Sequence, residues 1–347
     1  MSESAVALKT YFAPNFKIGF AVEPGLAATE PTHGLLVKHA STLTGENAMK
    51  PQPIGVSAGV YDYTRADQLI TFAQTNGIAV RGHTLVWHQT SPAWFFAGDK
   101  TDMAAYKATV RARLETYITD VVTHFKGKVY AWDVVNEVVS DDASATYRNS
   151  QWYQIFGWDY IDYAFKAARA ADPDVKLFIN DYSTEDAGKR GRLMTVIQGL
   201  QARGVPIDGV GHQMHISVNY PSAAQVDAAL KDVENLGLIN HITELDVSIY
   251  SNQGSCFSDT STCQAVIATG TTAYSNAIKA QASKYRELFT VFKAHASVQS
   301  VTLWGVADDH TWLDTYPVTR KNYPLLFDTT GHQKPAFWAI TDPDYVI

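Results

Sequence analysis

Two glutamates in this chain stand where a carboxylate can do chemistry. Glu137 ends the run WDVVNE (132–137), and Glu244 lies in the run HITELD (241–246). Each run is short, apolar and rich in β-branched residues, which predicts a buried parallel strand with the glutamate at its carboxyl end. A structural ion pair is the alternative, but neither run contains an arginine, and an unpaired buried carboxylate is costly. Two such carboxylates on one sheet can supply the acid–base chemistry that cleaves a glycosidic bond.

The elements that must position these glutamates alternate between strand-like and helix-like patterns. About eight β–α repeats without a break in composition predict an α/β protein, a (β/α)8 TIM barrel in a single domain over residues 1–347. A doubly wound open sheet is the alternative, but Glu23-Pro24 after the first strand replaces the expected glycine-rich turn. The predicted strands span 18–22, 42–47, 79–86, 129–136, 176–180, 209–215, 241–247 and 300–305. The predicted helices span 31–40, 67–76, 103–125, 158–171, 188–204, 223–236 and 272–295, and a last helix begins near Pro335.

Polar and aromatic side chains follow these strands at the carboxyl ends, where functional residues of such barrels gather. Lys50 alone could be a solvated lysine, but beside Glu46 and Asn47 it is placed to donate to substrate hydroxyl groups. Trp304 and Trp312 could be core residues, but around a polar loop they favour a wall on which a sugar stacks. Other polar or aromatic residues at these strand ends are His88, Asn180, Asp181, Tyr182, Asp308, Asp309 and His310. The candidate site residues are Glu46, Asn47, Lys50, His83, Trp87, Gln89, Asn136, Glu137, Gln213, His215, Glu244, Asp246, Trp304 and Trp312.

The histidines invite a metal-site interpretation, which strand geometry disfavours. His212 and His215 are three residues apart, so on one strand they face opposite sides. Gln213 and His215 share a face, and no metal-binding helix motif is present. We therefore predict a neutral core histidine at 212, a hydrogen-bonding role for His215, and neither a metal nor a cofactor.

Charge and composition limit the partners. The 347 residues carry a net charge of −7 without a basic cluster, which argues against nucleic acid, and no apolar run is long enough to span a bilayer. Residues 1–9 lack a signal-peptide pattern, which fits an intracellular protein or a trimmed secreted form. Cys256 and Cys263 lie in a polar loop, where we predict a disulfide rather than two exposed thiols. The pair favours a secreted protein, and we expect a monomer.

Several runs together resemble the family 10 glycoside hydrolases, the endo-β-1,4-xylanases of the (β/α)8 type. They follow the family's order and span nearly the whole chain. The matching runs are GENAMK (45–50), RGHTLVWH (81–88), WDVVNE (132–137), FINDY (178–182), VGHQMH (210–215), ITELD (242–246) and TLWGVAD (302–308).

The resemblance implies a retaining endo-β-1,4-xylanase that acts on xylan and xylo-oligosaccharides, with Glu137 as general acid/base and Glu244 as nucleophile. It implies that Asn136 bonds the sugar 2-hydroxyl and that His215 with Asp246 orients Glu244. Family members are usually secreted, and many carry separate carbohydrate-binding modules, which we do not expect within these residues. The resemblance places the remaining residues along the glycone subsites: Glu46, Asn47, Lys50, His83, Trp87, Gln89, Gln213, Trp304 and Trp312.

The chain departs from the family pattern in two places. The segment after Lys50 lacks an acidic residue, and the loop 251–270 is longer and holds both cysteines.

Two other functions compete with this one. Another β-glycanase, such as a cellulase or mixed-linkage glucanase, is disfavoured because Lys50 and Trp304 would crowd a hydroxymethyl group. A non-catalytic xylan-binding protein is disfavoured because both glutamates are present.

Overall fold

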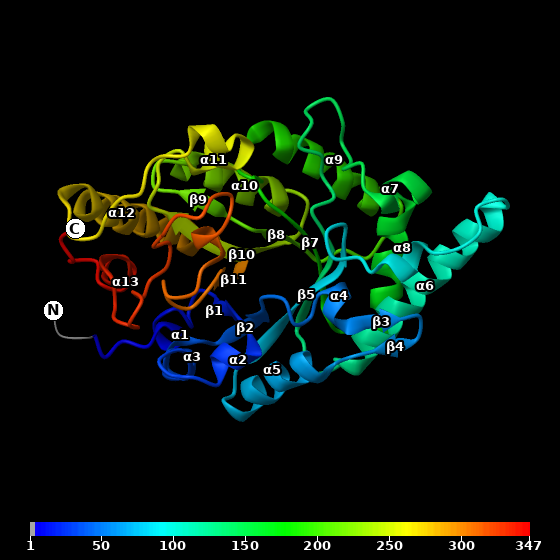
Figure 1. Cartoon of the computed structure of the whole chain (residues 1–347), viewed down its shortest axis with the longest axis horizontal. Coiled ribbons are helices and arrows are strands. Elements are labelled where there is room, and N and C mark those ends of the chain that lie inside the picture. The colour runs from blue at the N-terminus through cyan, green and yellow to red at the C-terminus, as the bar shows by residue number, and fades with distance from the viewer. Residues whose placement is uncertain (1–3) are drawn as a thin grey trace.

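Eight parallel strands close into a barrel in the computed structural model, which describes residues 4–347 (Figure 1). Pairing of the first barrel strand with the last one, and of the last one with its predecessor, closes the ring. Closure rules out the open doubly wound sheet and confirms the predicted (β/α)8 barrel. In ring order the strands are β1 (Lys17–Val22), β2 (Thr42–Gly45), β5 (Ala79–Trp87), β6 (Ala131–Asn136), β7 (Lys176–Asp181), β8 (Gly209–His212), β10 (Ile239–Ser248) and β11 (Val298–Leu303).

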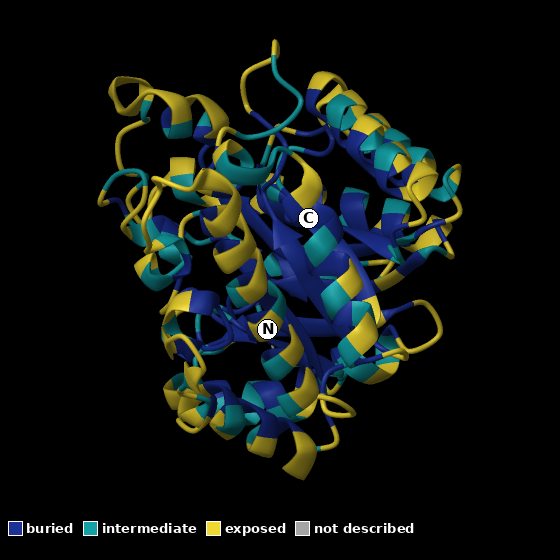
Figure 2. Ribbon diagram, turned by 90° about the vertical axis from the view of Figure 1, so that its right-hand side faces the viewer, coloured by how far each residue is buried: buried dark blue, intermediate teal, exposed yellow. Residues whose placement is uncertain are grey.

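Helices cover the outside of the barrel, with their buried faces against the strands and their exposed faces outward (Figure 2). Side-chain caps fix several helix starts: Asp102 caps α6, and Ser222 forms a capping box with Gln225 at α10. Every predicted helix is confirmed, with bounds within three residues. The helices that follow the barrel strands are α3 (Thr32–His39), α5 (Thr64–Thr75), α6 (Met103–His124), α8 (Asp159–Ala171), α9 (Ala187–Ala202), α10 (Ala223–Glu234), α12 (Thr272–Ala294) and α13 (Pro335–Thr341).

Short elements before the first barrel strand and in the connecting loops were not predicted as separate elements, because one or two turns of helix, or two or three residues of strand, show no detectable hydrophobic period. Several of them lie at the carboxyl end of the barrel and carry site residues. They are α1 (Leu8–Tyr11), α2 (Pro24–Ala27), α4 (Pro51–Ile54), β3 (Gly55–Ser57), β4 (Val60–Tyr61), η1 (Ala93–Phe96), α7 (Gln151–Phe156), β9 (His215–Ser217), α11 (Gln253–Ser258), η2 (Thr260–Thr262) and η3 (Trp312–Asp314).

Two predicted strands differ from the structure at the site. The strand predicted over 209–215 is wrong in its second half, because Met214 adopts a left-handed conformation (φ 60°) that interrupts it after β8. The chain resumes as β9, which pairs with β10 at Asp246. Glu244 lies inside β10, within the predicted span 241–247 but not at the carboxyl end of the strand, and it stands at a register irregularity between Ile242 and Leu245. Such irregularities re-aim side chains, and this one lies beside Glu244.

A buried ion pair joins two neighbouring strands of the barrel below the site. Arg81 of β5 and Asp133 of β6 form a two-pronged pair, with side chains 1% and 0% exposed. Burial alone would raise the pKa of Asp133, but the charge of Arg81 and a hydrogen bond from His83 hold it below its usual value. The Arg81 Nε also donates to Nδ1 of His241 at 3.2 Å. Arg81 and Asp133 therefore link β5, β6 and β10, and Asp133 also holds the His83 ring by a hydrogen bond of 2.9 Å.

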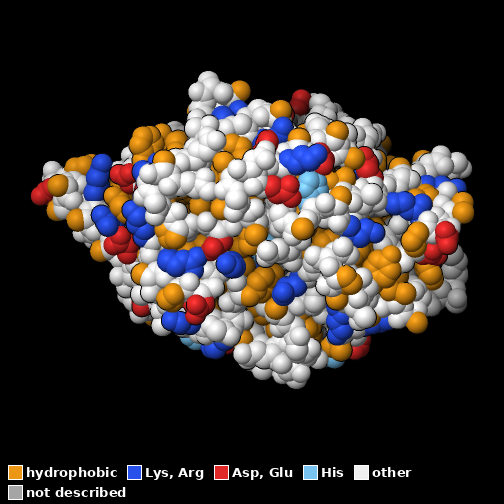
Figure 3. All heavy atoms as spheres, turned by 180° about the vertical axis from the view of Figure 1, so that it is seen from behind, with side chains coloured by type: hydrophobic (Ala, Val, Ile, Leu, Met, Phe, Trp, Pro, Cys, Tyr) orange, Lys and Arg blue, Asp and Glu red, His pale blue; other side chains and the backbone are white. Residues whose placement is uncertain are grey.

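The outer surface mixes charges of both signs. On the face seen in Figure 3, Lys and Arg side chains lie among acidic and hydrophobic ones. Within residues 4–347, the helices include none with the length and apolar character required to cross a membrane.

We predict that Arg81→Met will cost about 3–5 kcal/mol of the free energy of unfolding, because it leaves the Asp133 carboxylate buried without its countercharge. Denaturant unfolding measures this. Lys231→Met is the control, since Lys231 pairs with Asp227 in solvent. If Arg81→Met loses no more free energy of unfolding than Lys231→Met, the buried ion pair does not stabilise the fold as proposed.

Candidate active site

The backbone at Glu137 is held in a conformation that its residue type disfavours. Glu137 follows β6 with φ 60°, the left-handed region, which costs an L-residue roughly 1–2 kcal/mol. Its N–H donates to the Asn180 carbonyl at 2.8 Å, and its own carbonyl accepts from Arg148 Nε at 2.7 Å. Both peptide groups of Glu137 are thus fixed from outside its strand, and this directs its side chain into the barrel mouth.

The Glu137 carboxyl group accepts two hydrogen bonds from neutral donors. Trp87 Nε1 lies 2.8 Å from Oε2, and Gln213 Nε2 lies 3.1 Å from Oε1. Burial raises the pKa of Glu137, and the negative charge of Asp181 raises it further, against the effect of these two donors. Glu137 therefore retains its proton to higher pH than an ordinary glutamate.

The Glu244 carboxyl group has the opposite electrostatic environment. Asn180 Nδ2 donates to Oε1 at 2.8 Å, and His215 Nε2 lies 3.0 Å from Oε2. Burial would raise the pKa of Glu244, but the His215 hydrogen bond and the charges of His83 and His215 outweigh it, so the pKa is lowered. His83 Nδ1 lies 4.0 Å from Oε1. Glu244 is therefore ionised while Glu137 is still protonated.

His215 carries the positive charge that Glu244 requires. Its Nδ1 lies 2.8 Å from Asp246 Oδ2, which also accepts from Trp312 Nε1 at 2.8 Å. Burial would lower the pKa of His215, but Asp246 and Glu244 together raise it to about 10. The ring thus donates from both nitrogens, one to each carboxylate.

Asn180 contacts both glutamates: its carbonyl accepts the Glu137 N–H, and its side chain donates to Glu244. It was not predicted as a site residue, although it lies in the run FINDY (178–182). Its Nδ2 donates to Asn136 Oδ1 at 2.8 Å as well as to Glu244, and its Oδ1 accepts from Thr243. Gln213 Nε2 approaches the same Asn136 oxygen at 3.3 Å. The bonds fix the Asn136 amide with its NH2 group as the remaining donor. In the sequence, the only signal was a second asparagine at a strand end.

One side of the barrel mouth holds Lys50, Glu46 and Asn47. Their hydrogen-bond partners could not be predicted from the sequence. Lys50 Nζ donates to Asn47 Oδ1 at 2.8 Å and lies 4.9 Å from the Trp87 ring centre. Burial lowers the pKa of Lys50, against the charges of Glu244, Glu46, Glu137 and Glu23. Asn47 in turn donates to Glu23 Oε1 at 2.7 Å, and Glu46 pairs with His310 at 3.2 Å. Glu23 and His310 therefore belong to this side of the site.

Of the remaining predicted residues, Trp304 lies beside the glutamates and Gln89 does not. Trp304 is 8% exposed, with its ring 5.4 Å from His83 and 6.2 Å from His215, so it bounds the floor beside Glu244. Gln89 is exposed on the loop after β5, and within the described part of the chain no hydrogen bond joins it to the other predicted site residues. The structure thus brings together every predicted site residue except Gln89.

The disulfide loop reaches this site through an aromatic stack. The structure joins Cys256 in α11 to Cys263, and Cys256 is fully buried rather than exposed. Phe257, next to the first cysteine, stacks on Trp312 with ring centres 5.6 Å apart and an interplanar angle of 9°. Tyr316 completes the stack, 5.6 Å from Trp312. The loop therefore packs behind the indole that donates to Asp246.

Within residues 4–347, no group of three or more His, Cys, Asp or Glu side chains is arranged so that it could hold a metal ion. His212 is buried away from the glutamates, between Thr184 at 2.7 Å and Asn240 at 2.7 Å. Burial lowers its pKa to about 4, so it is the neutral core histidine that the sequence predicts.

A (β/α)8 barrel with two buried glutamates of opposite proton affinity at its mouth has the arrangement of glycoside hydrolases. The comparisons agree: the model of Glycosyl hydrolase family 10 matches residues 7–343, and the chain belongs to this family.

Similar proteins have named activities. An endo-1,4-beta-xylanase of Geobacillus stearothermophilus is 40% identical over 99% of this chain and 100% of its own length. A thermostable celloxylanase of Thermoclostridium stercorarium is 40% identical over 99% of this chain and 88% of its own. The crystal structure of xylanase B from Clostridium stercorarium F9 superposes with a TM-score of 0.89 at 41% identity, covering 97% of this chain and 99% of that one.

We predict that His215→Asn will raise the pKa of the Glu244 carboxyl group, because it removes the positive charge and leaves burial to dominate. Carbon-13 NMR titration of labelled glutamate carboxyls measures it. His212→Asn makes the same change at a neutral buried histidine and should leave that pKa where it is. An unchanged Glu244 pKa in His215→Asn would contradict the charge assigned to the ring.

Proposed function

We propose that this protein is a retaining endo-β-1,4-xylanase that hydrolyses internal linkages of xylan with Glu137 and Glu244. The opposite pKa shifts of these two glutamates carry the proposal, because double displacement needs one protonated acid and one ionised nucleophile at the same pH. Relatives that match nearly the whole chain are named as xylanases, which supports xylan as the substrate.

In the first step, the Glu244 carboxylate attacks the anomeric carbon while Glu137 donates its proton to the leaving glycosidic oxygen. His215 holds Glu244 by one oxygen, and Asn180 holds it by the other. Bond formation to Glu244 consumes its negative charge, which is one of the causes that raise the pKa of Glu137. Glu137 then loses its proton more readily and acts as base for the water that hydrolyses the glycosyl-enzyme.

Binding groups around the glutamates fit a pentose chain. Lys50 and Asn47 present hydrogen-bonding groups beside Trp87, and the free NH2 group of Asn136 is available for a sugar 2-hydroxyl. Lys50 and Trp304 together bound the position where glucose would carry its hydroxymethyl group. A steric exclusion of this kind typically discriminates by about 1–3 kcal/mol per group.

A related β-glucan activity is the second candidate, because one relative is named a celloxylanase. The walls at Lys50 and Trp304 would restrict glucose without excluding it completely, since a discrimination of about 1–3 kcal/mol leaves residual turnover. Xylan remains the main substrate in this proposal. We also propose, from the disulfide and the polymeric substrate, that the protein acts outside the cytoplasm. We propose a monomer as its state there.

Glu244→Ala should have no detectable turnover on xylan or aryl xylosides, because no covalent intermediate can form. Added azide should restore activity and give an α-glycosyl azide, since the small anion fills the space left by the carboxylate and attacks from the same side. Polarimetry or proton NMR of the product distinguishes the two anomers. Glu244→Gln is the control: its amide fills the space, so azide should not rescue it, and a β-configured azide would contradict the assignment.

Glu137→Ala should lower kcat/KM on xylan by about 100- to 10,000-fold, the usual contribution of a general acid. Its kcat/KM on dinitrophenyl xylobioside should stay close to that of the unmodified enzyme, because this leaving group departs without protonation. Steady-state kinetics on both substrates measures the difference. Equal losses on the two substrates would assign the acid role to another residue.

A further inference from the structure

We propose that Arg148 is a positioning residue for the acid/base glutamate, and that a four-charge network behind the site holds it in place. The inference rests on the proposed role of Glu137 as the acid/base. Arg148 touches the main-chain carbonyl of Glu137 through its Nε at 2.7 Å, while the carboxyl group of Glu137 is held by Trp87 and Gln213. Its effect on catalysis is therefore to fix the direction in which the acid points.

The chain folds back on itself to deliver Arg148 to this carbonyl. Val139 and Tyr147 form an antiparallel bridge, and the Arg148 N–H donates to the Val138 carbonyl at 2.7 Å. The guanidinium group then reaches Glu137, whose φ of 60° lies outside the range that glutamate prefers. Without an external donor on its carbonyl, this peptide could relax toward the ordinary extended conformation, and the carboxyl group would turn with it.

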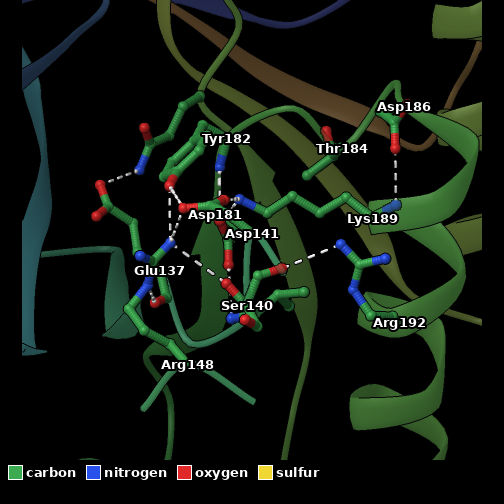
Figure 4. Close-up of polar contacts among 12 residues, drawn as sticks. Glu137, Ser140, Asp141, Arg148, Asp181, Tyr182, Thr184, Asp186, Lys189 and Arg192 are labelled. Carbon is green, nitrogen blue, oxygen red and sulfur yellow. Dashed lines mark hydrogen bonds and ion pairs between the residues drawn. The ribbon is translucent and has the colours of Figure 1, made fainter. Parts of the chain in front are cut away.

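Arg148 is itself fixed by groups on the neighbouring loop and strand, as Figure 4 shows for Tyr182 and Asp141. Its Nη2 donates to the Tyr182 hydroxyl at 2.7 Å, to Asp141 Oδ2 at 3.1 Å and to the Val139 carbonyl at 3.3 Å. Tyr182 in turn donates its hydroxyl proton to the same oxygen of Asp141 at 2.5 Å. The guanidinium plane therefore has fixed partners at Nε and at Nη2, which leaves little freedom for the side chain.

Lys189 completes the network from the first turn of α9. Its Nζ lies 2.9 Å from Asp141 Oδ1, 3.0 Å from Asp181 Oδ1 and 3.3 Å from the centre of the Tyr182 ring. The side chains of Lys189 and Asp181 are 6% and 0% exposed. Two cations and two anions thus balance, and Asp181 also accepts the N–H of Val139, two residues after Glu137. This second anchor ties the loop behind the acid to β7.

A matched control contacts the same loop from α9. Arg192 of α9 donates to the Ser140 carbonyl at 3.0 Å, as Arg148 donates to that of Glu137 (Figure 4). Arg192 thus resembles Arg148 in residue type and kind of contact but holds a peptide three residues further from the acid. Losing it should disturb the loop without turning Glu137.

The experiment measures kcat/KM for Arg148→Met, Arg192→Met, Glu137→Ala and the unmodified enzyme on xylan and on dinitrophenyl xylobioside. Arg148→Met should lose about 100-fold on xylan, the order expected when a catalytic group is displaced by about 1 Å, and little on the activated substrate. Arg192→Met should match the unmodified enzyme on both. Arg148→Lys, which can still donate one hydrogen bond to the carbonyl, should recover part of the loss on xylan.

Equal losses on both substrates, no loss, or the same pattern in Arg192→Met would each overturn the inference. Should Arg148→Met fail to fold, Asp141→Asn provides the second test, because it weakens the hold on Arg148 at a half-exposed position. It should give a smaller loss with the same dependence on the leaving group. Failure of the proposed function is separate: Glu137→Ala would then lose activity equally on both substrates, whatever Arg148→Met does.

Discussion

His215 lies between two buried carboxylates, Glu244 and Asp246, and donates to both only while its ring is positively charged. Burial works against this charge, and the two carboxylates together overcome it, so that the pKa of His215 reaches about 10. The charge lowers the pKa of Glu244 in return. The charged forms of His215 and Glu244 therefore stabilise each other. The difference between Glu244 and Glu137, on which the proposed chemistry depends, begins with this arrangement.

The barrel could be predicted from the sequence because each of its layers leaves a periodic signal. Strands buried on both faces read as short runs of β-branched residues, and the helices between them show an apolar face. The strand over 209–215 could not be divided correctly, since its interruption depends on one backbone angle at Met214. The strand predicted over 241–247 does contain Glu244, but β10 is longer by two residues at its start, which pair with β8, and by one at its end, which pairs with β9.

The site could be predicted where a residue's type at a strand end is sufficient, as for Glu137, Glu244 and Lys50. It could not be predicted where the role comes from a contact between distant segments. Arg148 lies eleven residues beyond Glu137 in an unremarkable polar loop, and only the fold-back of that loop brings it to the Glu137 carbonyl. Asn180 shows the same limit, because an amide that bridges two strands looks like any other asparagine in the sequence.

Substitutions in the loop that holds the disulfide can affect the pKa of a buried glutamate some distance away. Surface loops usually accept substitutions because little depends on them. Here Phe257 stacks on the ring of Trp312, and Nε1 of that indole donates a hydrogen bond to Asp246. Only three side chains, Trp312, Asp246 and His215, separate this exterior loop from Glu244. Replacing Phe257 would therefore change the pKa of Glu244, and a search for variants with a shifted working pH could begin in this loop, away from the two glutamates.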